Sequence, residues 1–208
     1  MKKGYVEVAF VLDETGSMHD IKEDTIGGFN QWLEEQKQLD VEETRFSLVL
    51  FSKIQGEKTY RMTYDGVPIE DVGELDESTY RPRGTTPLLD AIGITIDSLG
   101  TRLDEMAEDD KPENVIVAIL RDGLENASEE YTLERVKEMV THQQEKYGWH
   151  FIFLGCGIDA FAAGARMGIH QATTRRHDRS GRGVREAYAS TRRMMDEVLG
   201  VDEDQASE

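Results

Sequence analysis

Two apolar runs, Tyr5–Leu12 and Val115–Leu120, constrain the fold of this chain more than any other feature of the sequence. Each run has the length of a strand and carries few polar side chains, which is typical of strands that are buried on both faces of a sheet. Helical patterns lie between these runs and the other expected strands. Strands that alternate with helices indicate a parallel sheet covered by helices on both sides. The sequence therefore predicts an α/β fold, with a doubly wound, mostly parallel, Rossmann-like central sheet.

The other expected elements follow from apolar spacing and from residues that favour helix ends. Apolar side chains that begin at Leu88 recur at helical intervals and define one face. Pro87 suits the first position of that helix, with Thr86 as its cap, and Thr132 begins another helix. Irregular, acidic sequence between Val67 and Arg83 predicts a loop. The remaining expected elements are a helix from about Met18 to Leu33, strands at Thr44–Phe51, Thr59–Tyr64 (with Asp65-Gly66 as a turn) and His150–Leu154, and a short helix at Asp159–Met167.

The loop Asp13-Glu14-Thr15-Gly16-Ser17 directly follows the first apolar run. Its carboxylate and two hydroxyls recur at intervals of two residues, so a tight turn can direct three oxygens to one side. Oxygen ligands in octahedral arrangement are what Mg²⁺ prefers. One loop cannot supply a complete shell, so other loops must converge on it. Asp122 follows the second apolar run in the same way, and parallel sheets collect ligands at the carboxyl ends of their strands.

Two further segments complete the pattern: Gly84-Thr85-Thr86-Pro87-Leu88, and Arg121-Asp122-Gly123-Leu124-Glu125-Asn126. With the first loop, they make the chain resemble a von Willebrand factor type A (vWA) domain with its metal-ion-dependent adhesion site. That family's pattern is Asp-x-Ser-x-Ser, then a distant Thr, then a distant Asp. The run Phe151–Met167 also resembles small stand-alone vWA proteins of prokaryotes and phages. The resemblance covers about Tyr5–Gly168 and implies the metal ligands Asp13, Thr15, Ser17, Thr86 and Asp122.

By this resemblance the chain is a non-enzymatic protein–protein interaction module. The implied cofactor is Mg²⁺, with Mn²⁺ or Ca²⁺ as alternatives, and a partner protein supplies an Asp or Glu as the last ligand. Two residues depart from the usual pattern. Thr15 replaces a Ser and keeps the hydroxyl, whereas Arg121 stands where a small polar residue is frequent. Its guanidinium either turns outward or competes with the metal for Asp122.

Two other classes of function fit parts of the sequence. A metal-dependent phosphohydrolase would use Asp13 as nucleophile or ligand and His19 as acid or base. Thr15 stands where one such family requires a second Asp, and no Gly-rich phosphate loop is present. Nucleic-acid binding would use the arginines that follow Gln171. The formal charge of −18 argues against general nucleic-acid or anionic-membrane binding, because like charges repel.

Length and composition predict a folded protein of one main domain. The chain has 208 residues, and its single cysteine, Cys156, excludes an intrachain disulfide. It contains no apolar stretch long enough for a membrane span and no signal-peptide pattern, so we expect a cytoplasmic protein. We expect the vWA domain at 1–170, an Arg-rich extension with a terminal helix at 171–198, and a disordered tail at 199–208. The extension offers either a basic surface for a partner or a helix packed on the domain's own acidic surface.

Overall fold

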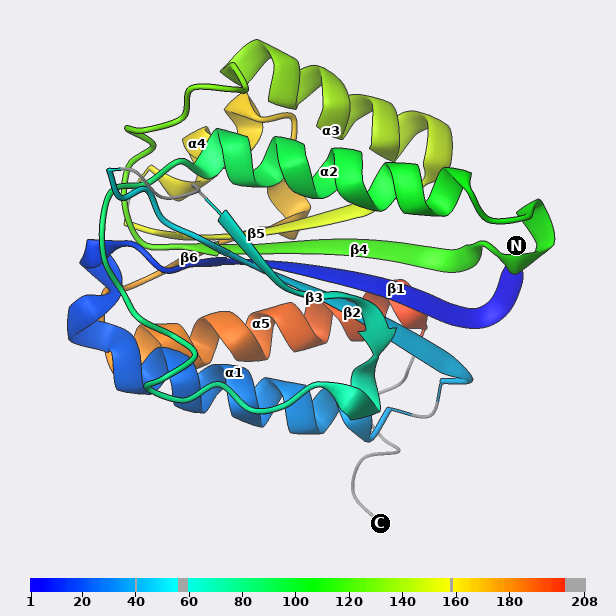
Figure 1. The fold of residues 1–208 in the computed structure, drawn as a ribbon, viewed down its shortest axis with the longest axis horizontal. Coiled ribbons are helices and arrows are strands. Elements are labelled where there is room, and N and C mark those ends of the chain that lie inside the picture. Colours follow the sequence, from blue (N-terminus) through cyan, green and yellow to red (C-terminus); the bar gives the residue numbers. More distant parts are fainter. Residues whose placement is uncertain (40, 56–59, 158, 201–208) are drawn as a thin grey trace.

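The central element of the computed structural model is a six-stranded sheet in the order β3-β2-β1-β4-β5-β6 (Figure 1). The model describes residues 1–39, 41–55, 60–157 and 159–200. All neighbouring strands are parallel except the β2–β3 pair, which is antiparallel. The strands are β1 (Lys2–Asp13), β2 (Glu43–Phe51), β3 (Tyr60–Pro68), β4 (Pro112–Arg121), β5 (His150–Cys156) and β6 (Thr174–His177).

Helices cover both faces of this sheet, as Figure 1 shows. One face carries two helices and the opposite face carries three, and short 3₁₀ segments join several of the elements. The first pair is α1 (Lys22–Lys37) and α5 (Gly181–Leu199); the second group is α2 (Leu88–Asp104), α3 (Leu133–Tyr147) and α4 (Ala160–Arg166). The expected α/β, doubly wound architecture is confirmed. No helix in the described ranges has the length and apolar character needed to cross a membrane.

The residues of β1 divide between two hydrophobic cores because successive side chains point to opposite faces of a strand. Phe10 and Leu12 lie in the core under α1 and α5, whereas Ala9 and Val11 lie in the core under α2 and α3. β1 pairs with β2 on one side and with β4 on the other. The first apolar run is therefore buried on both faces, as its composition predicts.

The start of α2 differs from the sequence prediction. Thr86 does not cap this helix: Pro87 occupies the cap position, and no side chain there accepts a helix N–H. The Glu125 carboxylate accepts a hydrogen bond from Leu89 N at 3.0 Å instead. The first turn of α2 is thus satisfied by a neighbouring loop, which leaves the Thr86 hydroxyl available for another role. The cap predicted at Thr132 is confirmed, since its side chain accepts from Arg135 N.

The third strand extends beyond the turn that the sequence predicts at Asp65-Gly66. Both residues lie inside β3, where Gly66 adopts a φ of 60° beside a shift in the pairing register. Glycine reaches this conformation without steric cost, so the pair marks an irregularity within the strand and not its end. The expected strand began at Thr59, which lies outside the described residues.

The C-terminal segment is part of the same sheet and core. β6 pairs with β5, and α5 packs along α1. Arg185 and Arg192 of α5 form ion pairs with Asp24 and Glu35 of α1. These arginines therefore meet the domain's own acidic surface, the second of the two alternatives that the sequence leaves open. The sequence predicts a disordered tail from residue 199, but Leu199 is the last residue of α5 and packs against the core. Residues 201–208 of that tail lie outside the described residues.

Candidate metal-binding site

Backbone hydrogen bonds hold the three predicted loops together at the carboxyl edge of β1 and β4. Gly16 N donates to Gly84 O at 3.1 Å, which joins the first loop to the second. Asn126 N donates to Thr86 O at 3.2 Å, and Thr86 N donates to the Asn126 side chain at 3.0 Å. The second loop is therefore tied to the third. Segments from distant parts of the chain converge here because parallel strands end at the same edge of the sheet.

The hydroxyl groups of Ser17 and Thr86 face a common point. A carbon added to Gly123 as a Cβ would lie 3.3 Å from Ser17 Oγ and 3.4 Å from Thr86 Oγ1. Thr15 Oγ1 lies 3.0 Å from Ser17 Oγ, and the Ser17 hydroxyl also contacts Asp122 O. The absence of a side chain at position 123 thus leaves room between hydroxyls that come from two different loops.

Asp13 is fully buried and organises the loop backbone. Its Oδ1 accepts from Thr15 N at 2.7 Å, and its Oδ2 accepts from Asp122 N at 3.0 Å. Burial raises the pKa of Asp13 to about 6, although the hydrogen bonds from Thr15 and Asp122 oppose this shift. Both carboxylate oxygens are engaged, so Asp13 suits indirect support of a cation through water. The exposed His19 makes no hydrogen bond with this carboxylate.

The Asp122 carboxylate forms an ion pair with Arg179, a residue that the sequence analysis did not single out. The Arg179 Nε lies 2.8 Å from Asp122 Oδ2, in a geometry that falls short of a hydrogen bond. The guanidinium also donates to Ser17 O. Arg179 precedes α5, and nothing in its local sequence distinguishes it from the other arginines of this segment. Its position depends on the packing of α5 against the domain.

Arg121 behaves in neither of the two ways that the sequence suggested. It is 3% exposed, so it does not turn outward, and it forms no ion pair with Asp122. Its guanidinium carbon instead lies 5.6 Å from the centre of the Phe153 ring. Burial lowers the pKa of Arg121.

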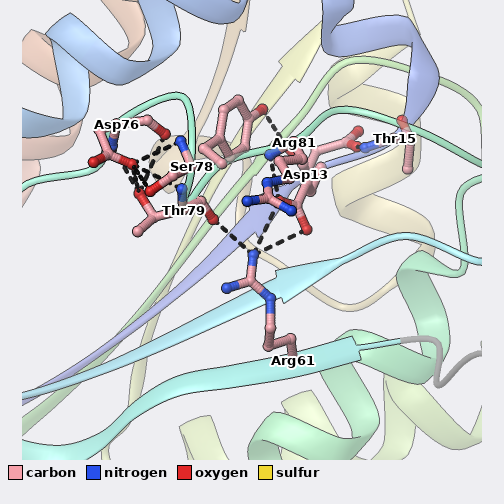
Figure 2. A network of polar contacts seen from close by, with 9 residues as sticks. Asp13, Thr15, Arg61, Asp76, Ser78, Thr79 and Arg81 are labelled. Atoms are coloured by element: carbon pink, nitrogen blue, oxygen red, sulfur yellow. Dashed lines mark hydrogen bonds and ion pairs between the residues drawn. The ribbon is translucent and has the colours of Figure 1, made fainter.

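The segment before the second loop is anchored on Glu14 and on Arg61, and Figure 2 shows the contact of Arg61 with Thr79. The Glu14 carboxylate is buried, accepts from Arg81 N at 2.6 Å and forms an ion pair with Arg61 at 3.0 Å. Arg61 also donates to Thr79 O at 2.7 Å, and the Tyr80 hydroxyl donates to Asp13 O at 2.5 Å. Residues 79–81 are therefore held against the first of the three loops, residues 13–17. The sequence placed Glu14 near this edge but did not assign it this supporting role.

The donor set fits a hard divalent cation. Ser17 Oγ, Thr86 Oγ1 and the Asp122 carboxylate gather oxygen atoms of the kind that Mg²⁺ and Mn²⁺ bind. No group of three His, Cys, Asp or Glu residues that could hold a metal occurs in the described part of the chain. A cation at this edge would therefore depend on the hydroxyl groups.

Solved structures share this fold at low sequence identity. The vWF domain of the type V pili tip protein Mfa5 from Porphyromonas gingivalis is 10% identical with a TM-score of 0.63, covering 98% of this chain and 99% of that chain. A von Willebrand factor type A structure from Catenulispora acidiphila is 15% identical with a TM-score of 0.57, covering 94% of this chain and 43% of that chain.

The proximal thread matrix protein 1 of the mussel byssus, in a structure described as having a zinc-occupied MIDAS motif, is 12% identical with a TM-score of 0.53. The match covers 95% of this chain and 45% of that one, so the chain spans less than half the length of this matrix protein. No protein-family model matches the chain, and no curated protein matches it significantly. The sheet order, the helices on both faces and these structures together show that the chain has the fold of a von Willebrand factor type A domain.

Proposed function

We propose that this chain is a non-enzymatic, metal-dependent protein-interaction module. The observation that carries the proposal is the meeting of the Ser17 and Thr86 hydroxyls beside Gly123, where the Ser17 hydroxyl also contacts the Asp122 backbone carbonyl. These groups come from three loops that share no local sequence. Hydrogen bonds between the loops hold them before any ligand arrives, which lowers the cost of ordering a site on binding.

In this proposal Ser17, Thr86 and Asp122 hold Mg²⁺, while Asp13 and Thr15 support it through water or by direct contact. A bound Mg²⁺ supplies an electrophilic centre that can accept a carboxylate from a partner protein as a further ligand. Neutral hydroxyls leave most of the ionic charge uncompensated, which favours an acidic side chain on the partner. Solved structures of a pilus tip protein and a byssus matrix protein, both with this fold, support an interaction role.

The arrangement around Asp13 favours binding over hydrolysis. A carboxylate that attacks phosphorus needs an oxygen directed at the substrate, but both Asp13 oxygens accept backbone N–H groups. His19 is exposed and is not hydrogen-bonded to Asp13. The geometry therefore gives no support to the phosphohydrolase alternative.

The substitution Ser17→Ala tests the site directly. It removes one ligand oxygen from a partly exposed position, and we expect Mg²⁺ affinity to fall by about tenfold, or ~1.4 kcal/mol. Isothermal titration calorimetry measures the affinity. The rise of the thermal unfolding midpoint with added Mg²⁺ gives a second measure, because a ligand of the native state stabilises it. Thr101→Ala, an exposed hydroxyl on α2, is the matched control and should bind as the parent does.

The metal-dependent binding of a partner protein is tested by using this chain to capture proteins from a cell extract, with and without Mg²⁺. We expect proteins retained by the parent chain with Mg²⁺ to be lost in chelator and lost by Ser17→Ala. Equal Mg²⁺ affinity of Ser17→Ala and the parent would contradict the metal site. Capture that persists unchanged in chelator would contradict the metal-dependent partner.

A further inference from the structure

Arg121 carries a buried positive charge that forms no ion pair within the described chain. The residue is 3% exposed, and no described carboxylate lies within ion-pair distance of its guanidinium. Its Nε is buried and has no hydrogen-bond acceptor. The Phe153 ring is a weak substitute, since a cation over an aromatic face gains much less than a buried charge loses by leaving water. A buried guanidinium in this state indicates a missing anion.

Arg102 differs from Arg121 in its carboxylate partners, although the Nε of each arginine lacks a hydrogen bond. The Arg102 side chain is 26% exposed, yet its two terminal nitrogens donate to the two Glu7 oxygens at 3.0 and 2.9 Å. The less buried arginine therefore has a bidentate partner, whereas the more buried Arg121 has none in the described chain.

Arg121 lines a pocket of about 660 Å³ between α2, α4 and the loop after β4. Much of the remaining lining is apolar and includes Leu88, Leu89, Leu124 and Met167. Leu124, which lines this pocket, is 67% exposed and so offers apolar surface that a ligand can cover. A largely apolar pocket of this size with a few charged groups at its wall, here Arg121, Glu125, Asp159 and Arg166, has the form of a small-molecule site.

The acidic residues of the pocket do not neutralise Arg121. Glu125 accepts hydrogen bonds from the backbone N–H groups of Leu89, Ala127 and Ser128, which engage both of its oxygens. Asp159 is exposed at the start of α4 and is not paired with Arg121. The pocket also carries a second cation, Arg166, so its two arginines are balanced in number by these two carboxylates. The carboxylates disfavour a multiply charged anion, so a monoanion fits the pocket best.

We propose that this pocket binds a small organic monocarboxylate, with its carboxylate on the Arg121 guanidinium and its apolar body against the leucines. The planar guanidinium matches the two oxygens of a carboxylate. Asp13 and Asp122 act on the Arg121 charge over a distance longer than that of an ion pair. The Arg121 guanidinium lies over Phe153 whereas the neighbouring Asp122 pairs with Arg179, so the proposed anion and the proposed cation use different side chains. The inference therefore stands independently of metal binding.

The probe for the test is hexanoate, added to protein freed of metal and of chelator. The ¹⁵N resonance of the Arg121 Nε reports contact with the carboxylate. We expect a saturable shift with hexanoate, and binding weaker by at least about tenfold for acetate, which lacks the apolar body, and for hexanol, which lacks the charge. No saturable shift with hexanoate would overturn the proposal, as would tighter binding of inorganic phosphate.

Two variants separate the charge from the cavity. Arg121→Met removes the guanidinium and keeps an unbranched apolar chain, and it should abolish hexanoate binding while the amide spectrum stays native. Ala162→Trp fills the pocket from α4 and leaves Arg121 in place, so it should also abolish binding. The exposed Arg135→Met changes the charge equally outside the pocket and should bind normally. Undiminished binding by Ala162→Trp, or by a folded Arg121→Met, would refute the assignment.

Discussion

Arg179 is the residue at which the C-terminal segment meets the metal-site loops. Its guanidinium contacts the Asp122 carboxylate and the Ser17 backbone carbonyl, so it lies against two of the residues proposed to surround the metal. A cation at this edge and the guanidinium are attracted to the same carboxylate. The Arg179 side chain is 47% exposed, so water screens this ion pair and the competition is modest.

Replacing Arg179 by Ala should therefore increase Mg²⁺ affinity. We expect about a two- to fivefold gain, in line with the ~0.5–1 kcal/mol of a half-exposed ion pair. Isothermal titration calorimetry at constant ionic strength measures it. Arg176→Ala, an exposed arginine of the same segment, controls for the change in net charge alone. An equal gain in both variants would show that Arg179 does not compete for Asp122.

At the scale of elements, α1 and α5 pack through a position where no side chain fits. A Cβ on Gly28 would lie 2.5 Å from the Tyr188 ring of α5, whereas a Cβ on Gly27 would meet nothing within 4 Å. The sequence shows two adjacent glycines that both weaken α1 and does not distinguish their roles. In the structure, Gly28 permits the close packing of α5 on α1, whereas Gly27 does not take part in it.

The two glycines give a matched pair of substitutions. Gly28→Ala should lower the free energy of unfolding by about 1–3 kcal/mol, because the added methyl group displaces the Tyr188 ring. Gly27→Ala should leave it unchanged or raise it by up to ~1 kcal/mol, because alanine favours the helix. Chemical denaturation measures both values. Equal effects of the two substitutions would contradict the packing of α5 on α1.

At the scale of the whole molecule, the C-terminal segment completes the core. Several apolar residues of α5 are fully buried against the sheet, and β6 forms its last strand. The buried residues are Val184, Ala187, Tyr188, Met194 and Met195. The domain boundary that the sequence predicts at residue 170 therefore falls inside one structural unit.

A chain that ends at residue 170 should consequently fail to fold cooperatively. Removal of α5 exposes one face of the core, and each large buried side chain contributes about 1.5–3 kcal/mol, which together exceeds the stability of an ordinary domain. Circular dichroism during thermal unfolding is the measurement, with the full chain as reference. A sharp transition in the shortened chain would show that 1–170 is an independent domain.

Much of the fold and part of the candidate site could be predicted from local patterns. The strand at Tyr5–Leu12 and the helical face that begins at Leu88 are recognised from the spacing of their apolar residues, which is a local property of the sequence. The predictions failed where a distant group replaced a local one. Thr86 has the residue type of a helix cap, but Glu125 from another loop satisfies the helix instead. Asp65-Gly66 has the composition of a turn, but pairing with β2 continues β3 through it.

The sequence by itself determined most of the segments that become strands and helices, although not β6, and it placed Asp13 and Asp122 at the ends of two buried strands. Those outcomes follow from side-chain period and burial, which a chain carries locally. The tertiary structure alone decided that Arg179 lies on Asp122 and that Arg121 is buried beside a pocket and forms no ion pair within the described chain. Such long side chains can reach many partners, so their positions follow from how distant elements pack.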